Sequence, residues 1–167
     1  KKYLAEMIGT MVLVLMGCGT AVSLNCGLDT ASVVGTAMAF GLAVVAMAYT
    51  IGGISGCHIN PAITLGCLLT GRISGKDAGM YMIFQVIGAF IGSALLAVLV
   101  SGLTPGGTTT GANACSGDVI NGLIAEIVLT AIFVLVVLGT TDEKKGAGNF
   151  AGLAIGLSLI LIHLVGI

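Results

Sequence analysis

The sequence of 167 residues contains very little charge. Only 8% of its residues are Asp, Glu, Lys or Arg, whereas a soluble domain has about 25%. It has no tryptophan and only 2 prolines, and its 6 basic and 7 acidic residues leave a net charge of −1. These deficits exclude a soluble enzyme, a nucleic-acid-binding protein and a disordered tail.

Apolar residues and glycine make up most of the chain. Hydrophobic residues account for 57% of it, and there are 27 glycines. The glycines show no third-residue period, which excludes a collagen-like chain. Glycine within apolar runs instead favours close packing between helices in lipid. The composition therefore predicts an integral membrane protein of the all-α class.

Five apolar stretches are long enough to cross a bilayer, which takes about 20 helical residues. They are expected at Tyr3–Leu24, Ala31–Ile54, Gly79–Ser101, Val119–Thr140 and Asn149–Ile167.

One uncharged run is too long for a single span. Residues 30–71 contain no Asp, Glu, Lys or Arg, and as one helix they would extend roughly 63 Å, about twice the hydrocarbon core. Glycines at 52, 53 and 56 mark a break, and Asn60-Pro61 follows it. Asn60 suits an N-cap and Pro61 the first helical turn. The sequence predicts a short helix over Asn60–Thr70 that re-enters the membrane without crossing it.

The positions of the basic residues support this re-entrant interpretation. With the N-terminus in the cytoplasm and no crossing by the short helix, every lysine and arginine falls on the inner side, as the positive-inside rule requires. A crossing helix would instead place two of them outside. The six residues are Lys1, Lys2, Arg72, Lys76, Lys144 and Lys145.

Two short patterns recur along the chain. Ala5-Glu6 recurs as Ala125-Glu126 at an offset of 120, and Ala39-Phe40-Gly41-Leu42 recurs as Ala154-Ile155-Gly156-Leu157 at an offset of 115. Three spans separate the two copies, so the second copy is inverted in the membrane. Inverted repeats are typical of channels and transporters with a site near the midplane, built from broken helices.

The repeat predicts one transmembrane channel domain over residues 1–167. The first repeat covers residues 1–118, and residues 119–167 begin the second. Adding 115 to Asn60 puts the partner of the re-entrant motif near position 175, so these 167 residues hold an incomplete second copy.

Glu6 and Glu126 are acidic residues at membrane depth, where ionisable groups are costly and usually functional or paired. One interpretation makes them carriers in a proton-coupled transporter. The other makes them structural buried acids that accept hydrogen bonds from N–H groups left free by a non-helical loop. We favour the second, because a broken helix leaves such donors nearby.

The non-helical segment before Asn60 is the strongest candidate for a binding surface. It must line a water-filled cavity or be buried in protein, and its carbonyls can then accept hydrogen bonds from a polar permeant. No other His or acidic residue stands at ligand spacing from its Cys-His pair, so no metal, cofactor or catalytic residue is expected. The residues with pore-lining carbonyls are Gly56, Cys57, His58 and Ile59.

The five cysteines are scattered, and most suit packing positions. Only Cys26 and Cys115 are expected near the same outer face, and whether they pair stays open.

The segment Ser55-Gly56-Cys57-His58-Ile59-Asn60-Pro61-Ala62-Ile63-Thr64 resembles the first Asn-Pro-Ala loop of the aquaporin (major intrinsic protein) family. Ala5-Glu6 and Ala125-Glu126 are similar to the starts of the family's first and fourth spans. Leu161-Ile162-His163-Leu164 looks like the fifth span of a bacterial subgroup. The resemblance covers the whole chain, and the second Asn-Pro-Ala motif, its following arginine and the sixth span are absent from these 167 residues.

The resemblance implies a truncated inverted-repeat bundle that acts as a passive, water-selective channel in the inner membrane, assembled as a homotetramer and excluding protons and ions. Asn60, Pro61 and Ala62 would form the pore motif, with the Asn60 amide presented to water by the half-helix. Phe40 and His163 would form part of the selectivity filter. The resemblance implies no enzyme activity.

Two rival functions stay open from the sequence. A glycerol facilitator of the same family would be expected to have a wider, less polar constriction, which His163 argues against. A proton-coupled transporter would use Glu6 and Glu126. A membrane-embedded enzyme needs a nucleophile and a base within reach, and the sequence shows no such pair.

Overall fold

The structure is a computed structural model that describes residues 1–101, 110–115 and 117–167. Within these residues the chain forms only helices and connecting loops. The elements are α1 (Lys2–Ser23), α2 (Thr30–Ser55), α3 (Pro61–Leu69), α4 (Gly75–Val100), α5 (Val119–Thr140), the 3₁₀-helix η1 (Gly148–Phe150) and α6 (Ala151–Gly166).

Local sequence signals set the helix ends. The Asp29 carboxylate accepts hydrogen bonds from the first N–H groups of α2, and that helix ends at Gly56, whose φ of 85° is in the left-handed region. The Asn60 side chain accepts from the Ala62 N–H at 2.8 Å, with Pro61 at the first helical position of α3. The predicted cap and break are confirmed.

Within the described part of the chain, five helices are long and apolar enough to cross a membrane, as predicted. The short helix α3 has nine residues, or about 14 Å, and cannot cross. Most boundaries agree with the prediction within two residues, but α4 begins at Gly75 rather than Gly79. The Ser74 hydroxyl accepts a hydrogen bond from the Asp77 N–H and caps the helix. The first turn of α4 contains charged residues, so the apolar stretch predicted from hydropathy does not include it.

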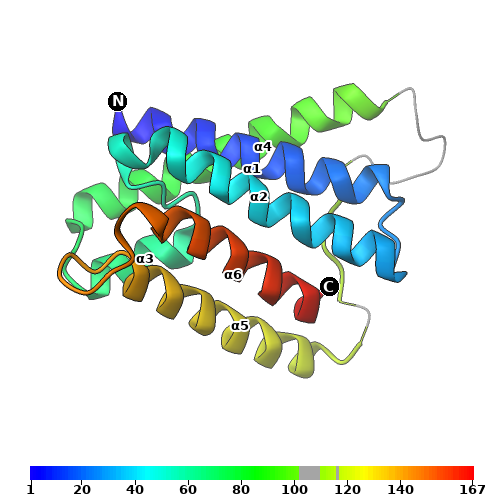
Figure 1. Cartoon of the computed structure of the whole chain (residues 1–167). Coiled ribbons are helices and arrows are strands. Elements are labelled where there is room, and N and C mark those ends of the chain that lie inside the picture. Colours follow the sequence, from blue (N-terminus) through cyan, green and yellow to red (C-terminus); the bar gives the residue numbers. More distant parts are fainter. Residues whose placement is uncertain (102–109, 116) are drawn as a thin grey trace.

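The helices form a single bundle in which α1 packs against α2 and α4, and α6 packs against α2 and α5. The half-helix α3 contacts α4 and α5. The N-terminus, α3 and the connection between α5 and α6 all lie at one end of the bundle (Figure 1). At that end Lys2 pairs with Asp77 at 2.8 Å, and Arg72 donates to Thr141 at 2.8 Å. The basic residues therefore gather at one end, as the re-entrant interpretation requires.

Two glycines at equivalent positions of the predicted repeat bring the backbones of α2 and α6 close together. A Cβ added at Gly41 would lie 2.5 Å from the Gly156 carbonyl oxygen, and one added at Gly156 would lie 2.6 Å from the Gly41 oxygen. Only glycine permits this backbone contact. The two residues are equivalent in the predicted repeat, so the repeats meet at matching positions, as an inverted-repeat bundle requires.

Glu126 is exposed among the described residues, so its assignment as a structural buried acid stays a prediction. It lies on the same face of α5 as the buried Phe133, two turns closer to the start of the helix. Burial needs a neighbouring element, and the described residues leave the Glu126 side chain uncovered. Its symmetry mate Glu6 is fully buried, because α2, α4 and the loop before α3 surround it.

Candidate functional site

The loop between α2 and α3 has an unusual backbone. Positive φ angles occur at Gly56 (85°), Cys57 (52°) and Ile59 (41°). Glycine adopts this region readily, whereas a β-branched residue such as Ile59 rarely does. Each such non-glycine residue costs about 1–3 kcal/mol, so surrounding contacts must hold the loop in place.

Glu6 on α1 provides those contacts. Its Oε1 accepts from the Ser55 hydroxyl at 2.6 Å and from the His58 N–H at 3.0 Å. Its Oε2 accepts from the Ile59 N–H at 2.7 Å and from the Gln85 amide at 2.7 Å. Hydrogen bonds to an ionised acceptor are about twice as strong as neutral ones. The carboxylate therefore offsets the strain of the loop.

The partners of Glu6 limit what this residue can do. All four are donors, and together they occupy both oxygens of a side chain with 0% exposure. An ionised carboxylate accepts hydrogen bonds only, whereas a protonated one must also donate. This geometry suits a side chain that acts only as a hydrogen-bond acceptor for the loop and for Gln85.

A second layer of polar side chains fastens the loop from α4. The Gln85 amide nitrogen donates to Glu6 and also to the Thr64 hydroxyl of α3 at 3.1 Å. The Tyr81 hydroxyl donates to the Ser55 carbonyl at 2.6 Å. Sequence reasoning missed both residues, although an uncharged amide at the centre of an apolar span is itself a signal.

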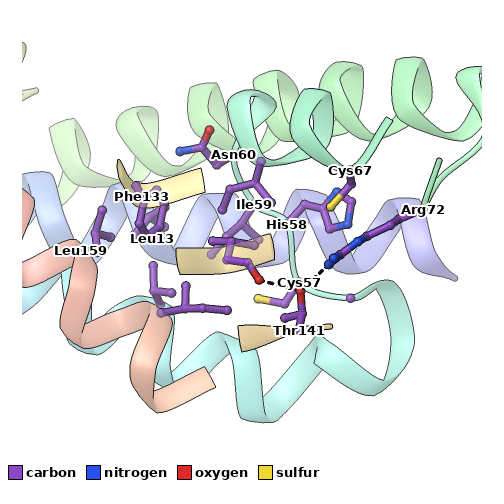
Figure 2. Close-up of a pocket in the computed structure, with 15 residues that line it drawn as sticks. Leu13, Cys57, His58, Ile59, Asn60, Cys67, Arg72, Phe133, Thr141 and Leu159 are labelled. Carbon is purple, nitrogen blue, oxygen red and sulfur yellow. Dashed lines mark hydrogen bonds between the residues drawn. The ribbon is translucent and has the colours of Figure 1, made fainter. Parts of the chain in front are cut away.

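A cavity of about 230 Å³ lies beside this loop (Figure 2). Residues 56–60 form one wall of it. The liquid volume of one water molecule is roughly 30 Å³, so the cavity has room for several. The apolar wall comes from α1, α2, α3, α5 and α6, through Leu13, Val44, Ile63, Phe133, Val137, Ile155 and Leu159.

The loop offers the cavity both donors and acceptors. The Oδ1 atom of Asn60 is occupied by the Ala62 N–H, which leaves its NH₂ group for other partners. The N–H groups of Cys57, His58 and Ile59 are taken by Ser55 and Glu6. Within the described residues, the carbonyls of residues 56–59 accept no hydrogen bond. These oxygens are therefore available to a polar molecule.

Arg72 lies at the end of the cavity near the α5–α6 connection, pointing toward Thr141 (Figure 2). Its guanidinium donates to the Thr141 hydroxyl at 2.8 Å and to the Leu138 carbonyl at 2.9 Å, and lies 3.9 Å from the Asp142 carboxylate. It thus ties the end of α3 to the last turn of α5. The sequence assigned Arg72 to one side of the membrane but gave no partner for it.

Phe40 and His163 come together away from this cavity. Their rings stack with centroids 4.7 Å apart and planes 19° apart. Gly17 makes room for the Phe40 ring, since a side-chain carbon there would overlap it. The His163 Nδ1 faces the Leu159 carbonyl at 2.9 Å. A carbonyl can only accept, so Nδ1 holds a proton and donates it.

The remaining reactive groups near the site are the cysteines and possible metal ligands. All five cysteines are free, and Cys26 and Cys115 are both exposed without a bridge between them. Cys57 and Cys67 line the cavity. In the described ranges no group of three His, Cys, Asp or Glu side chains is placed to hold a metal ion.

Five membrane-length helices and a capped half-helix beside a polar-walled cavity define a multi-pass membrane protein with a re-entrant loop. The Major intrinsic protein family profile matches residues 1–167. Aquaporin Z of Rhodopseudomonas palustris is 47% identical, over 99% of this chain and 72% of that protein. Aquaporin Z of Bradyrhizobium diazoefficiens is 43% identical, over 100% of this chain and 73% of that protein. The chain belongs to the major intrinsic protein family.

A solved structure shows the same fold. The aquaglyceroporin from Plasmodium falciparum superposes with a TM-score of 0.80, over 98% of this chain and 69% of that chain. Sequence identity is 24%, so this similarity concerns the fold alone.

Proposed function

We propose that the protein is a passive water channel. The observation that supports this most is the wall of residues 56–60, where unpaired carbonyls stand next to the free NH₂ group of Asn60 in a cavity of about 230 Å³. The similarity to two proteins named Aquaporin Z agrees with it.

Water can exchange its hydrogen bonds with the bulk for bonds to this wall. A molecule beside Asn60 accepts from the side-chain amide, and its hydrogens point to the carbonyls of residues 56–59. The opposite, apolar wall forms no hydrogen bonds with the water molecule. The water is therefore bound weakly and can pass to the next position along the pore. The mechanism lowers the barrier to permeation with no covalent step and no cofactor.

The half-helix α3 supplies the proposed barrier to cations and protons. Asn60, Pro61 and Ala62 form its N-terminal end, where the helix dipole is equivalent to roughly half a positive charge. A cation or an excess proton at Asn60 meets this positive end, whereas neutral water only reorients. The anion that holds the loop, Glu6, is fully buried behind it.

We assign selectivity among neutral solutes to Phe40 and His163. The stacked rings, 4.7 Å apart, combine a bulky apolar surface with a polar edge. Such a constriction passes water and excludes glycerol, which needs a wider slot with an apolar side.

We further propose a homotetramer in the inner membrane, with the N-terminus in the cytoplasm. The gathering of basic residues at the end of the bundle that holds Lys2 and Arg72 supports this orientation. Residues 1–167 form one channel domain, with a first repeat over 1–118 and the beginning of the second over 119–167.

Stopped-flow measurements on proteoliposomes test the proposal. The protein should accelerate osmotic water flux and leave glycerol flux at the level of empty vesicles. His163→Gly should raise glycerol flux several-fold while water flux persists. Leu161→Gly is the matched control, because it introduces the same helix-weakening residue on an exposed face of α6 and should not admit glycerol. Unchanged water flux with the wild-type protein would refute the proposal.

A further inference from the structure

His58 carries the imidazole on the wall formed by residues 56–60, and the position of its ring proton decides what it offers the cavity. A neutral imidazole has one N–H donor and one bare nitrogen acceptor. The hydrogen bond made by one ring nitrogen determines whether that nitrogen or the other one holds the proton. The assignment therefore depends on the groups around the ring.

Thr64 supplies the hydrogen-bond partner of the ring. Its Oγ1 lies 3.1 Å from the His58 Nδ1 and is fully buried. The ring also meets Tyr81 edge-on, at 5.0 Å between centroids. The Tyr81 hydroxyl, however, donates to the Ser55 carbonyl. Among the residues that the structure describes, Nε2 has no hydrogen-bond partner.

Three groups surround the Thr64 hydroxyl, each at 3.1 Å. The Gln85 amide nitrogen can only donate to it, and the Asn60 carbonyl can only accept from it. The amide orientation is itself fixed, because the same nitrogen donates to the Glu6 carboxylate. The third group, the His58 Nδ1, can do either.

Only one proton arrangement makes all three contacts attractive. The hydroxyl donates to Asn60, and its two lone pairs accept from Gln85 and from a protonated Nδ1 of His58. If the hydroxyl donated to His58 instead, the Thr64 and Asn60 oxygens would face each other at 3.1 Å without a hydrogen between them. A helical threonine readily makes this bond to the carbonyl four residues earlier.

We infer that Thr64 fixes the ring proton of neutral His58 on Nδ1, which leaves Nε2 as an additional water acceptor on the cavity wall. The inference rests on the proposed function for its ligand, water. Thr64 and Gln85 are positioning residues that act through His58. Residues 56–59 then present acceptors to the cavity, and Asn60 presents the donors. Each water molecule along residues 56–59 is therefore oriented with its hydrogens toward the wall.

The unpaired Oε1 of Gln85 agrees with this role. Among the described residues it has no hydrogen-bond partner, and it belongs to a side chain with 1% exposure. Leaving a buried acceptor unsatisfied destabilises the folded state. The contribution of Gln85 therefore comes from its amide nitrogen, which donates to both Glu6 and Thr64.

Solid-state NMR of the protein in bilayers, with ¹⁵N-labelled histidine, distinguishes protonated from bare ring nitrogens. At about pH 8 both histidines are neutral unless their pKa values are strongly raised. We expect His58 to show a protonated Nδ1 and a bare Nε2. His163 serves as an internal reference, because its Nδ1 faces a carbonyl. A proton on the Nε2 of wild-type His58 would overturn the inference.

Substitutions at Thr64 test the positioning role. Thr64→Val removes the hydroxyl and should lose at least half of the Nδ1–H signal of His58 to the Nε2–H form, with His163 unchanged. Thr64→Ser should restore the wild-type spectrum. Thr70→Val is the matched control, since that hydroxyl bonds only to carbonyls of α3. An unchanged His58 in Thr64→Val would refute the role of Thr64.

Two further outcomes are decisive. If Thr64→Val does not assemble in the membrane, the wild-type and Thr64→Ser spectra still decide, because a proton on Nε2 in either contradicts the inference. Water flux is measured on the same preparations. A wild-type protein with bare Nε2 but no water flux would refute the proposed function and leave the proton placement standing.

Discussion

Replacing Glu6 by leucine or by glutamine should separate the hydrogen-bonding role of this residue from its charge. Both variants remove the negative charge, so the loss of charge and its desolvation affect them similarly. They differ in how many buried donors lose their acceptor. The difference in the free energy of unfolding between Glu6→Leu and Glu6→Gln therefore measures the hydrogen bonds alone.

The contacts give the size of this difference. In Glu6→Gln, an amide nitrogen at the Oε1 position can donate to Ser55, whose hydroxyl reorients, and the His58 N–H is the one donor left unpaired. In Glu6→Leu, the N–H groups of His58 and Ile59 and the amide of Gln85 all lose their acceptor. Two additional orphaned donors cost about 1–3 kcal/mol each. Leucine should thus be less stable than glutamine by about 2–6 kcal/mol.

Unfolding in mixed micelles titrated with a denaturing detergent, followed by circular dichroism, measures both variants. Glu143→Leu and Glu143→Gln are the matched controls, because Glu143 is exposed in the α5–α6 connection. Each should lie within about 0.5 kcal/mol of wild type. If the leucine and glutamine variants at position 6 were equally stable, Glu6 would not be the residue that holds the loop.

Two other predictions concern helix contacts and pH. Gly41→Ala should destabilise the bundle by about 1–3 kcal/mol, because the new methyl group meets the Gly156 carbonyl; Gly52→Ala, with open space around it, is the control in the same unfolding assay. The Ser32 hydroxyl and the backbone N–H groups hold the pKa of Asp29 below its ordinary value, so its capping contribution is full above pH 4 to 5 and is lost as pH falls toward the lowered pKa. The protection of the first α2 amides against hydrogen exchange, relative to their intrinsic rates at each pH, should fall over that acidic range in wild type but not in Asp29→Asn, which keeps a capping side chain without the charge. An equal pH dependence of protection in both proteins would contradict this.

Much of the fold could be predicted from the sequence, because its determinants are local. Five apolar stretches of sufficient length specified the five spans, and Asn60-Pro61 specified where the half-helix begins. The charge-free run specified that α3 does not cross. An acid within an apolar stretch indicated that Glu6 needs donors, since an unpaired carboxylate at membrane depth is too costly to persist. Spacing, capping and hydropathy act within a few residues of one another, so one sequence is enough to identify them.

Only the tertiary structure decided which distant groups meet. The sequence could not show that the Gln85 amide connects Glu6 to Thr64, since α4, α1 and α3 supply one residue each. It also could not show that Phe40 stacks on His163. The same limit applies to the exposure of Glu126, because a residue pattern records the burial preference of a side chain and not whether a neighbour covers it. Side chains far apart in the chain are brought within hydrogen-bonding distance by helix packing, and packing depends on the whole bundle.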